Sequence, residues 1–269
     1  MVKVVLITGI SSGFGKAISE LLSSKGYIVY GFSRKQSEDL KGNIKVLQAD
    51  VTDPDSIQNG VSKLVKREGR IDILINNAGM GITGSIEDCS HEDIHLQMST
   101  NFMGYVNMIQ AVLPSMRKQG GGTIVNISSI GGLMGLPYQG FYAASKFAVE
   151  GLSESLRMEL IPFKIKVIVI QPGDFFTSFT ANRKPIQSEG NDGAYTAQFR
   201  KTLSIIEKDE TGGLKPEYLA RKLAKILEKK NPCHSYIVAT LEQKFAVVLK
   251  RILPGSLFAS ILSSHYGIK

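Results

Sequence analysis

Near-continuous apolar runs of strand length alternate along this chain with longer segments of helical period. VVLIT (4–8), IDILIN (71–76) and KVIVIQ (166–171) are rich in Val, Ile and Leu and lack regular polar alternation. Such runs predict strands buried on both faces, because a strand with one solvent-exposed face has a polar residue at every second position. The order of elements therefore predicts an α/β fold, with helices on both faces of a doubly wound parallel sheet.

The rest of the chain follows the same alternation. Further strands are expected at 27–32, 44–49, 123–128 and 235–240, and helices at 14–25, 54–67, 94–118, 141–161 and 215–229. No internal repeat and no linker divides these elements, so we expect one domain over residues 1–269.

The composition is typical of a folded protein of the cell interior. Apolar residues make up 43% of the 269 positions, and the two cysteines, Cys89 and Cys233, stand far apart in no metal-like spacing. This cysteine usage indicates a reducing compartment. The start, MVKVVLITG, lacks the layout of a signal peptide, and no run of 18 apolar residues occurs. We therefore expect a cytoplasmic protein without a membrane-spanning helix.

The net charge of +8 predicts a solvated basic surface. The lysines are scattered, and no basic stripe is interleaved with aromatic residues, so we expect no nucleic-acid partner. An acidic acyl carrier would also suit such a surface.

A glycine-rich turn, TGISSGFG (8–15), connects the first predicted strand to the first predicted helix. Glycines at such a turn allow tight curvature and a close approach to a pyrophosphate, and the helix N-terminus offers unpaired N–H groups to the phosphates. The turn is no P-loop, because Lys16 is followed by Ala17 instead of a hydroxyl residue. We predict that the turn holds a dinucleotide through Gly9, Ser11, Ser12, Gly13, Phe14 and Gly15.

The end of the second predicted strand favours NADP over NAD. A fold selective for NAD usually places an acid here for the ribose 2′-hydroxyl, but this chain has Ser33, Arg34 and Lys35. A guanidinium beside a small hydroxyl suits a 2′-phosphate. After the third predicted strand, Asp50 and Val51 are expected to flank the adenine.

Five motifs in this order resemble those of the short-chain dehydrogenase/reductase family: TGISSGFG, NNAG (76–79), Asn101, the serines of NISS (126–129) and YAASK (142–146). The resemblance covers residues from about 3 to about 180. It implies a Rossmann-type fold with a seven-stranded parallel sheet, a nicotinamide cofactor, and a homodimer or homotetramer. LPSMR (113–117) and SESLRMEL (153–160) are similar to the hydroxysteroid and retinol dehydrogenase-like group.

The resemblance implies a catalytic site of Asn101, Ser129, Tyr142 and Lys146. Tyr142 would be the acid/base, and Ser129, thirteen residues earlier, would donate a hydrogen bond to the substrate oxygen. Residues four apart on a helix share a face, so Lys146 can approach the phenol. A phenol pKa of about 10 falls to neutrality only with about 4 kcal/mol of phenolate stabilisation, which a buried Lys146 would supply together with the positive charge of the oxidised nicotinamide. Asn101 would hold a water of a proton relay.

Further residues are expected around the cofactor, as the resemblance implies, and around the substrate, from the position and apolar character of the segments. Asn77, Ala78 and Gly79 of NNAG, with Tyr142, Lys146, Pro172, Gly173 and Thr177, are expected to contact the cofactor. The polar segment 174–213, in which we expect no strand, would be a substrate lid. Met134, Pro137, Phe175, Phe176 and Phe179 would either form an apolar substrate pocket or fill the core of the lid.

Two further segments have alternative interpretations. Residues 241–269 place apolar side chains at helical spacing around Lys250 and Arg251, which fits either a helix that covers the core or an amphipathic segment that contacts a membrane or a partner subunit. HEDIH (91–95) matches a zinc-protease pattern, but Ser90 and Asp93 predict a capping box in an exposed first turn. We expect no metal there.

The sequence thus predicts an NADP(H)-dependent oxidoreductase of a hydrophobic alcohol or carbonyl compound such as a steroid, retinoid or lipid. The first alternative is a ketoreductase of the same fold that acts on acyl-carrier thioesters. The second is a dinucleotide sensor without catalysis, which the complete set of four site residues disfavours.

Overall fold

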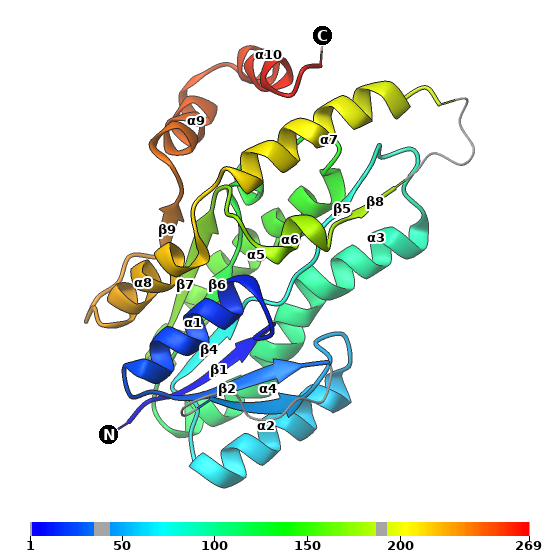
Figure 1. The fold of residues 1–269 in the computed structure, drawn as a ribbon. Helices are drawn as coiled ribbons and strands as arrows, with labels where there is room; N and C mark the ends of the chain where they lie inside the picture. The colour runs from blue at the N-terminus through cyan, green and yellow to red at the C-terminus, as the bar shows by residue number, and fades with distance from the viewer. Residues whose placement is uncertain (1, 35–43, 187–192, 269) are drawn as a thin grey trace.

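Seven parallel strands form the central sheet, in the order β3-β2-β1-β4-β6-β7-β9 (Figure 1). The computed structural model describes residues 2–34, 44–186 and 193–268. The strands are β1 (Val4–Thr8), β2 (Ile28–Ser33), β3 (Ile44–Gln48), β4 (Ile73–Asn76), β6 (Gly122–Ile127), β7 (Ile165–Pro172) and β9 (Ser235–Val238). The winding reverses between β1 and β4, and ligands bind at the carboxyl ends of strands at such a switch point. The predicted Rossmann-type sheet is confirmed.

Helices cover both faces of the sheet, which makes three layers (Figure 1). On one face lie α1 (Gly13–Ser24) and α8 (Pro216–Leu227), and on the other lie α2 (Pro54–Glu68), α4 (Gly104–Lys118) and α5 (Gly140–Glu159). The strands are apolar throughout because each contributes to two cores. In β1, Val5 and Ile7 pack toward α1 and α8, while Val4 and Leu6 pack toward the opposite helices.

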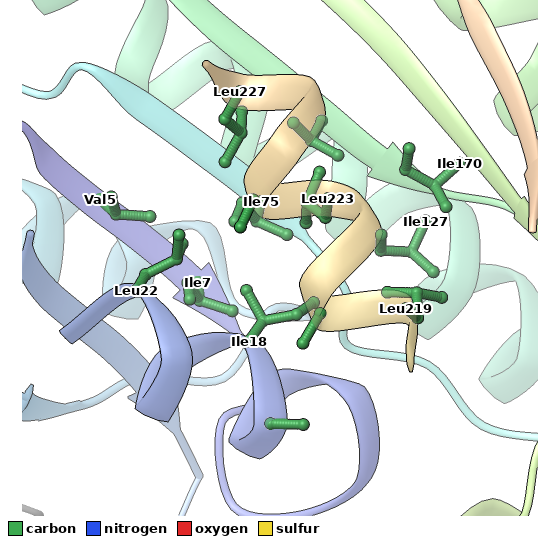
Figure 2. Close-up of a cluster of buried hydrophobic side chains, with 14 of the residues drawn as sticks. Val5, Ile7, Ile18, Leu22, Ile75, Ile127, Ile170, Leu219, Leu223 and Leu227 are labelled. Carbon is green, nitrogen blue, oxygen red and sulfur yellow. The ribbon is translucent and has the colours of Figure 1, made fainter. Parts of the chain in front are cut away.

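The core between α8, α1 and the sheet is formed by branched aliphatic side chains (Figure 2). Leu219 and Leu223 of α8 are at most 1% exposed and lie over the strands, with Ile18 of α1 beside them. Burying each such side chain contributes about 1.5–3 kcal/mol, so this layer fixes where α1 begins relative to β1.

The predicted helix over 94–118 is interrupted. It forms α3 (His91–Met98), a π-helical turn η1 (Ser99–Met103) and then α4. Ser90 caps α3 by accepting a hydrogen bond from the Asp93 backbone N–H at 3.1 Å, as the sequence indicates. The wide π-turn is a feature that often marks functional positions, and Asn101 lies inside it.

The segment 174–213 is more regular than predicted. It contains α6 (Ser178–Ala181), α7 (Thr196–Thr211) and the short strand β8 (Lys184–Pro185), which pairs in parallel with β5 (Ile82–Thr83). The expectation of an irregular segment without a strand is therefore wrong. One face of α7 carries Phe199, Thr202 and Ile206 at spacings of three and four, and the last two are buried. The otherwise polar segment therefore has the buried face of a helix. Residues 187–192 of the predicted lid lie outside the described residues.

The chain ends in two helices that lie at one end of the molecule, beyond the sheet (Figure 1). These are α9 (Leu241–Ile252), which begins at a capping box of Thr240 and Gln243, and α10 (Gly255–His265), which follows the break at Pro254. Each buries one side chain, Val247 in α9 and Phe258 in α10. The two 3-10 turns are η2 (Ile130–Gly132) and η3 (Ile161–Phe163). Within the described residues no helix is both long and apolar enough to cross a membrane.

Candidate active site

The glycines of the turn between β1 and α1 are required by backbone conformation or by close packing. Gly9 and Gly13 have positive φ angles of +69° and +53°, which favour glycine. A Cβ on Gly15 would lie 2.0 Å from the Gly9 carbonyl oxygen, so the helix approaches the turn directly. A Cβ on Gly13 would lie 3.6 Å from Thr177 Cβ, which places the loop after β7 opposite the turn. Ser11 and Ser12 are exposed at the tip of the turn.

A set of hydrogen bonds joins the turn to the NNAG segment across the switch point. The hydroxyl oxygen of Thr8 accepts from the backbone N–H groups of Asn77 and Ala78, both at 2.9 Å. The Asn77 amide in turn donates to the carbonyl oxygens of Thr8 at 2.9 Å and Gly9 at 3.1 Å. These bonds hold the ends of β1 and β4 in a fixed relation. The turn, the NNAG segment and the helix N-terminus thus form a cradle that fits a pyrophosphate.

The predicted ribose and adenine residues lie along the adjacent strand ends. Ser33 is half-buried at the end of β2, and Arg34 is exposed beside it. Asp50 accepts hydrogen bonds from the backbone and hydroxyl of Thr52, and Val51 is buried against Gly104. Lys35 lies outside the described residues.

Tyr142 and Ser129 meet at the carboxyl end of β6. Ser129 precedes η2, where its hydroxyl oxygen accepts from the Gly131 N–H at 3.0 Å, and Tyr142 lies in the first turn of α5. Burial raises the pKa of Tyr142 to about 12, and a hydrogen bond from the Ser129 hydroxyl opposes this rise. The serine therefore stabilises the phenolate, as a partner of an acid/base tyrosine would.

Lys146 is a buried cation on the same face of α5, 4% exposed. Its Nζ donates to the Ile127 carbonyl oxygen at 2.9 Å and lies 5.9 Å from the centroid of the Tyr142 ring. Burial lowers the pKa of Lys146 to about 8, and the charge of Glu150 opposes this change. A lysine close to its titration point near neutrality can both accept and release a proton.

Asn101 is fully buried, with 0% exposure, in the π-turn. Its Oδ1 accepts from the Met80 N–H at 2.9 Å, and its Nδ2 donates to the Met80 carbonyl oxygen at 3.0 Å and to Ser145 Oγ at 3.3 Å. Ser145 lies between Tyr142 and Lys146 in α5. The four residues from 101, 129, 142 and 146 thus converge on one end of the sheet.

Sequence reasoning missed two buried residues that support these groups. The ring of Tyr105 lies beneath Lys146, 5.3 Å from its Nζ, and its hydroxyl donates to the Ile127 carbonyl oxygen that Lys146 also uses. Gln97, one helical turn before Asn101, bonds to the backbone of Ile82 and Met80 on either side of Gly81. Their spacing of four on each side of Asn101 was the available signal, because these positions share a face on a regular helix.

The loop after β7 forms the opposite wall of the site. Pro172 is buried, and a Cβ on Gly173 would lie 2.1 Å from Gln243 Oε1. Thr177 caps α6, its hydroxyl oxygen accepting from the Phe179 N–H at 3.1 Å.

The five predicted substrate residues are placed differently from one another. Phe179 lies beside Tyr142, with 5.7 Å between ring centroids. Phe175 is 4% exposed and packs edge-on against Phe14 in the core between α1 and α8, and Met134 is buried against α9 and α10. Phe176 is exposed, and Pro137 is half-buried.

The HEDIH histidines lie on α3 and are exposed. Among the described residues, no group of three or more His, Cys, Asp or Glu side chains is arranged to hold a metal ion.

A doubly wound parallel sheet, a glycine turn at its switch point and a buried Tyr–Lys pair beside that turn define a dinucleotide-dependent oxidoreductase. The sequence model of the short chain dehydrogenase family matches residues 3–188. The chain belongs to the short-chain dehydrogenase/reductase family, and it is an oxidoreductase that acts on CH–OH groups.

Two curated relatives and two solved structures illustrate the similarity. The 3-ketodihydrosphingosine reductase of Bacteroides thetaiotaomicron is 49% identical over 267 residues, 99% of each chain. Human 17-beta-hydroxysteroid dehydrogenase type 1 is 38% identical over 195 residues, 65% of this chain and 58% of that protein. A short-chain dehydrogenase from Streptomyces avermitilis has a TM-score of 0.83 at 30% identity, covering 97% of this chain and 95% of its own. ElxO, solved with NADP bound, has a TM-score of 0.73 at 28% identity, covering 88% and 97%.

The burial of Lys146 predicts a stability that depends on pH. Its pKa is about 8 in the folded protein and near the ordinary 10.5 in the unfolded chain, so the unfolded chain binds more protons between these values. The free energy of unfolding should therefore rise with pH across this window, by up to about 3 kcal/mol relative to Lys146→Met. Urea unfolding followed by circular dichroism measures the difference. The exposed Lys222→Met is the control, and parallel curves for wild type and Lys146→Met would contradict the burial.

Proposed function

We propose that this chain is an NADP(H)-dependent reductase of a long-chain lipid ketone of the kind named for its Bacteroides relative. The observation that carries the proposal is 49% identity across 99% of both chains. Similarity over the full length includes the segment 174–213 and the terminal helices. The human hydroxysteroid dehydrogenase also acts, by its name, on a hydrophobic alcohol.

Residues at the end of β2 support NADP as the cofactor. The position where an acid would bind a ribose 2′-hydroxyl holds Ser33, and Arg34 follows it at an exposed position. A similar solved structure at 28% identity, ElxO, carries NADP. Arg34 would pair with the 2′-phosphate, while the glycine turn would hold the pyrophosphate.

Tyr142 is proposed to deliver the proton to the carbonyl oxygen. The bound nicotinamide supplies the hydride that the carbonyl carbon accepts. Ser129, already hydrogen-bonded to Tyr142, would donate to the same carbonyl oxygen and polarise it. A phenol with a raised pKa remains protonated at neutral pH, so Tyr142 is in the acid form that reduction needs.

Lys146 and Asn101 would return a proton to Tyr142 after each turnover. Lys146 lies 5.9 Å from the tyrosine ring and has a pKa of about 8, so it exchanges protons readily near neutrality. Its positive charge also lowers the cost of a transient phenolate. Asn101, fixed to Met80 and Ser145, would hold the water that connects Lys146 to solvent.

Replacing Tyr142 by Phe tests the assignment of the acid. We expect kcat for ketone reduction to fall by about a hundredfold to ten-thousandfold, which is the range for loss of a general acid. NADPH binding, measured by fluorescence titration, should change by less than about twofold, because the ring and fold remain. Tyr218→Phe on α8 is the matched control. Retained turnover in Tyr142→Phe would contradict this mechanism.

Replacing Arg34 by Ala tests the cofactor preference. Loss of a charge-assisted contact to the 2′-phosphate should lower the ratio of kcat/KM for NADPH over NADH by about tenfold to a hundredfold. Steady-state kinetics with both cofactors measure the ratio, with the exposed Arg221→Ala as the control. An unchanged ratio would mean that another group selects the cofactor.

The terminal helices support a proposal of contact with an anionic membrane surface. Their exposed apolar side chains are Leu241, Phe245, Val248 and Ile252 on α9, with Leu257 and Ile261 on α10. Lys250 and Arg251 are exposed among them. Apolar groups flanked by cations are typical of helices that lie in a lipid interface. A long-chain substrate dissolved in a membrane would reach the enzyme from that surface.

A double substitution tests this contact. Phe245→Ser with Ile252→Ser should reduce binding to vesicles of phosphatidylserine and phosphatidylcholine by about tenfold or more, because each removes exposed apolar area that the lipid would bury, at about 25 cal/mol per Å². Co-sedimentation measures the bound fraction. Ile161→Ser, which removes an equally exposed side chain on η3, is the control. Equal binding by all three proteins would exclude the terminal helices as the contact.

The cytoplasmic location and the homodimer or homotetramer stay predictions. The basic surface leaves the acyl-carrier ketoreductase as the second candidate function. The assays above, repeated with an acyl-carrier thioester, separate the two substrates.

A further inference from the structure

Arg183 is a buried cation whose hydrogen bonds are incomplete. It lies between α6 and β8, and its side chain is 2% exposed. Its Nη2 donates to Glu210 Oε1, but Nε and Nη1 are buried without a hydrogen-bond partner among the described residues. Unpaired donors inside a protein cost free energy, and a guanidinium usually has most of its five N–H groups paired. Two donors are therefore available to an acceptor that the described chain does not supply.

These donors lie close to the reacting end of the site. Arg183 Cζ is 5.7 Å from the centroid of the Phe179 ring, and that centroid is 5.7 Å from the centroid of Tyr142. The ring of Phe179 thus lies beside both the guanidinium and the phenol. The pKa of Tyr142 is raised mainly by burial, but the charges of Glu210, Arg183 and Asp174 also act on it. The cluster is within electrostatic reach of the proton donor.

The ion pair of Arg183 is also part of the lid. Glu210 is on α7, and its second oxygen accepts from the Thr180 hydroxyl of α6 at 2.5 Å. The pair therefore connects the two lid helices. This structural role uses one nitrogen of the guanidinium and does not account for the other two.

The surroundings of Arg183 select the kind of acceptor. The cluster contains three carboxyl groups, those of Asp174, Asp209 and Glu210. His265 lies beside it, with Nε2 2.9 Å from Asp209 Oδ2. Burial, followed by the charges of Glu210 and Asp209, raises the pKa of Asp174 to about 6. An added carboxylate or phosphate would meet this negative field, whereas a hydroxyl or an ammonium would not.

We propose that Arg183 is a head-group binding residue that donates from Nε and Nη1 to a hydroxyl oxygen of the substrate. The substrate ketone lies at Tyr142, and an ammonium group faces Asp174 and Glu210. This inference rests on the proposed function and names its substrate class: a long-chain ketone whose head group carries a hydroxyl, which Arg183 would bind, and an ammonium, which the carboxyl groups would attract.

Three ketones of equal chain length test the inference with the full-length protein and NADPH. The first carries no head group, the second carries the hydroxyl, and the third carries the hydroxyl and the ammonium. We expect kcat/KM to rise by about tenfold to a hundredfold from the first ketone to the second, as for a hydrogen bond to a charged group. The third should exceed the second.

Arg183→Lys is the variant that isolates the free donors. The lysine retains a cation for Glu210 but removes Nε and Nη1, so it should abolish most of the gain from the hydroxyl. The neighbouring Lys184→Gln, which removes an exposed cation paired with Asp93, is the matched control and should keep the gain. NADPH titration and thermal unfolding show whether each variant is folded.

The outcomes separate this inference from the function on which it rests. If wild type reduces the first and second ketones equally well, the donors meet only water and the inference is wrong, but the reductase proposal stands. If wild type reduces none of the three, both proposals fail. If Arg183→Lys does not fold, the wild-type comparison of the ketones still decides.

Discussion

The site depends on the hydroxyl of Thr8, which joins the two strand ends at the switch point. That one oxygen accepts hydrogen bonds from two backbone N–H groups of the NNAG segment. The Asn77 amide donates two hydrogen bonds to backbone carbonyl oxygens of the turn. Two adjacent parallel strands part here because their helices leave to opposite faces. Without these bonds the N–H and carbonyl groups at the parting would be unpaired, and the cradle for a pyrophosphate would have no fixed shape.

Burial acts in opposite directions on the two titratable groups of α5. It raises the pKa of Tyr142 to about 12 and lowers the pKa of Lys146 to about 8, since each group loses the hydration of its charged form. Burial thereby separates two pKa values that are nearly equal in water, 10.0 for the phenol and 10.5 for the amine. The tyrosine remains protonated and the lysine becomes exchangeable, which suits delivery of a proton and its replacement.

The sequence predicts the sheet and the position of the four central residues, because both follow from local patterns. Buried strands such as Val4–Thr8 are recognised from their composition, and Tyr142 and Lys146 share a helix face at a spacing of four. The structure adds a hydrogen bond between this helix and the π-turn, in which the Ser145 hydroxyl oxygen accepts from the Asn101 amide. A π-turn adds one residue to a helical turn, and residue types alone do not reveal this.

Other parts were beyond local patterns. The helix Thr196–Thr211 was overlooked because its polar composition masks a narrow apolar stripe. Arg183 and Glu210 are 27 residues apart, and they meet only because α6 and α7 pack together. Phe175, for which the sequence leaves a substrate pocket and the core of the lid as alternatives, packs edge-on against Phe14 in the core between α1 and α8.

The side chain of Gln243 has a consequence for the whole C-terminal part. It completes the capping box of α9, and its Nε2 also donates to Asp174 Oδ2 at 2.5 Å, in the loop that forms a wall of the site. A displacement of α9 would therefore also displace that loop. The last 29 residues are therefore part of the structure around the site. A chain shortened before α9 would lose the amide that donates a hydrogen bond to the Asp174 carboxyl group.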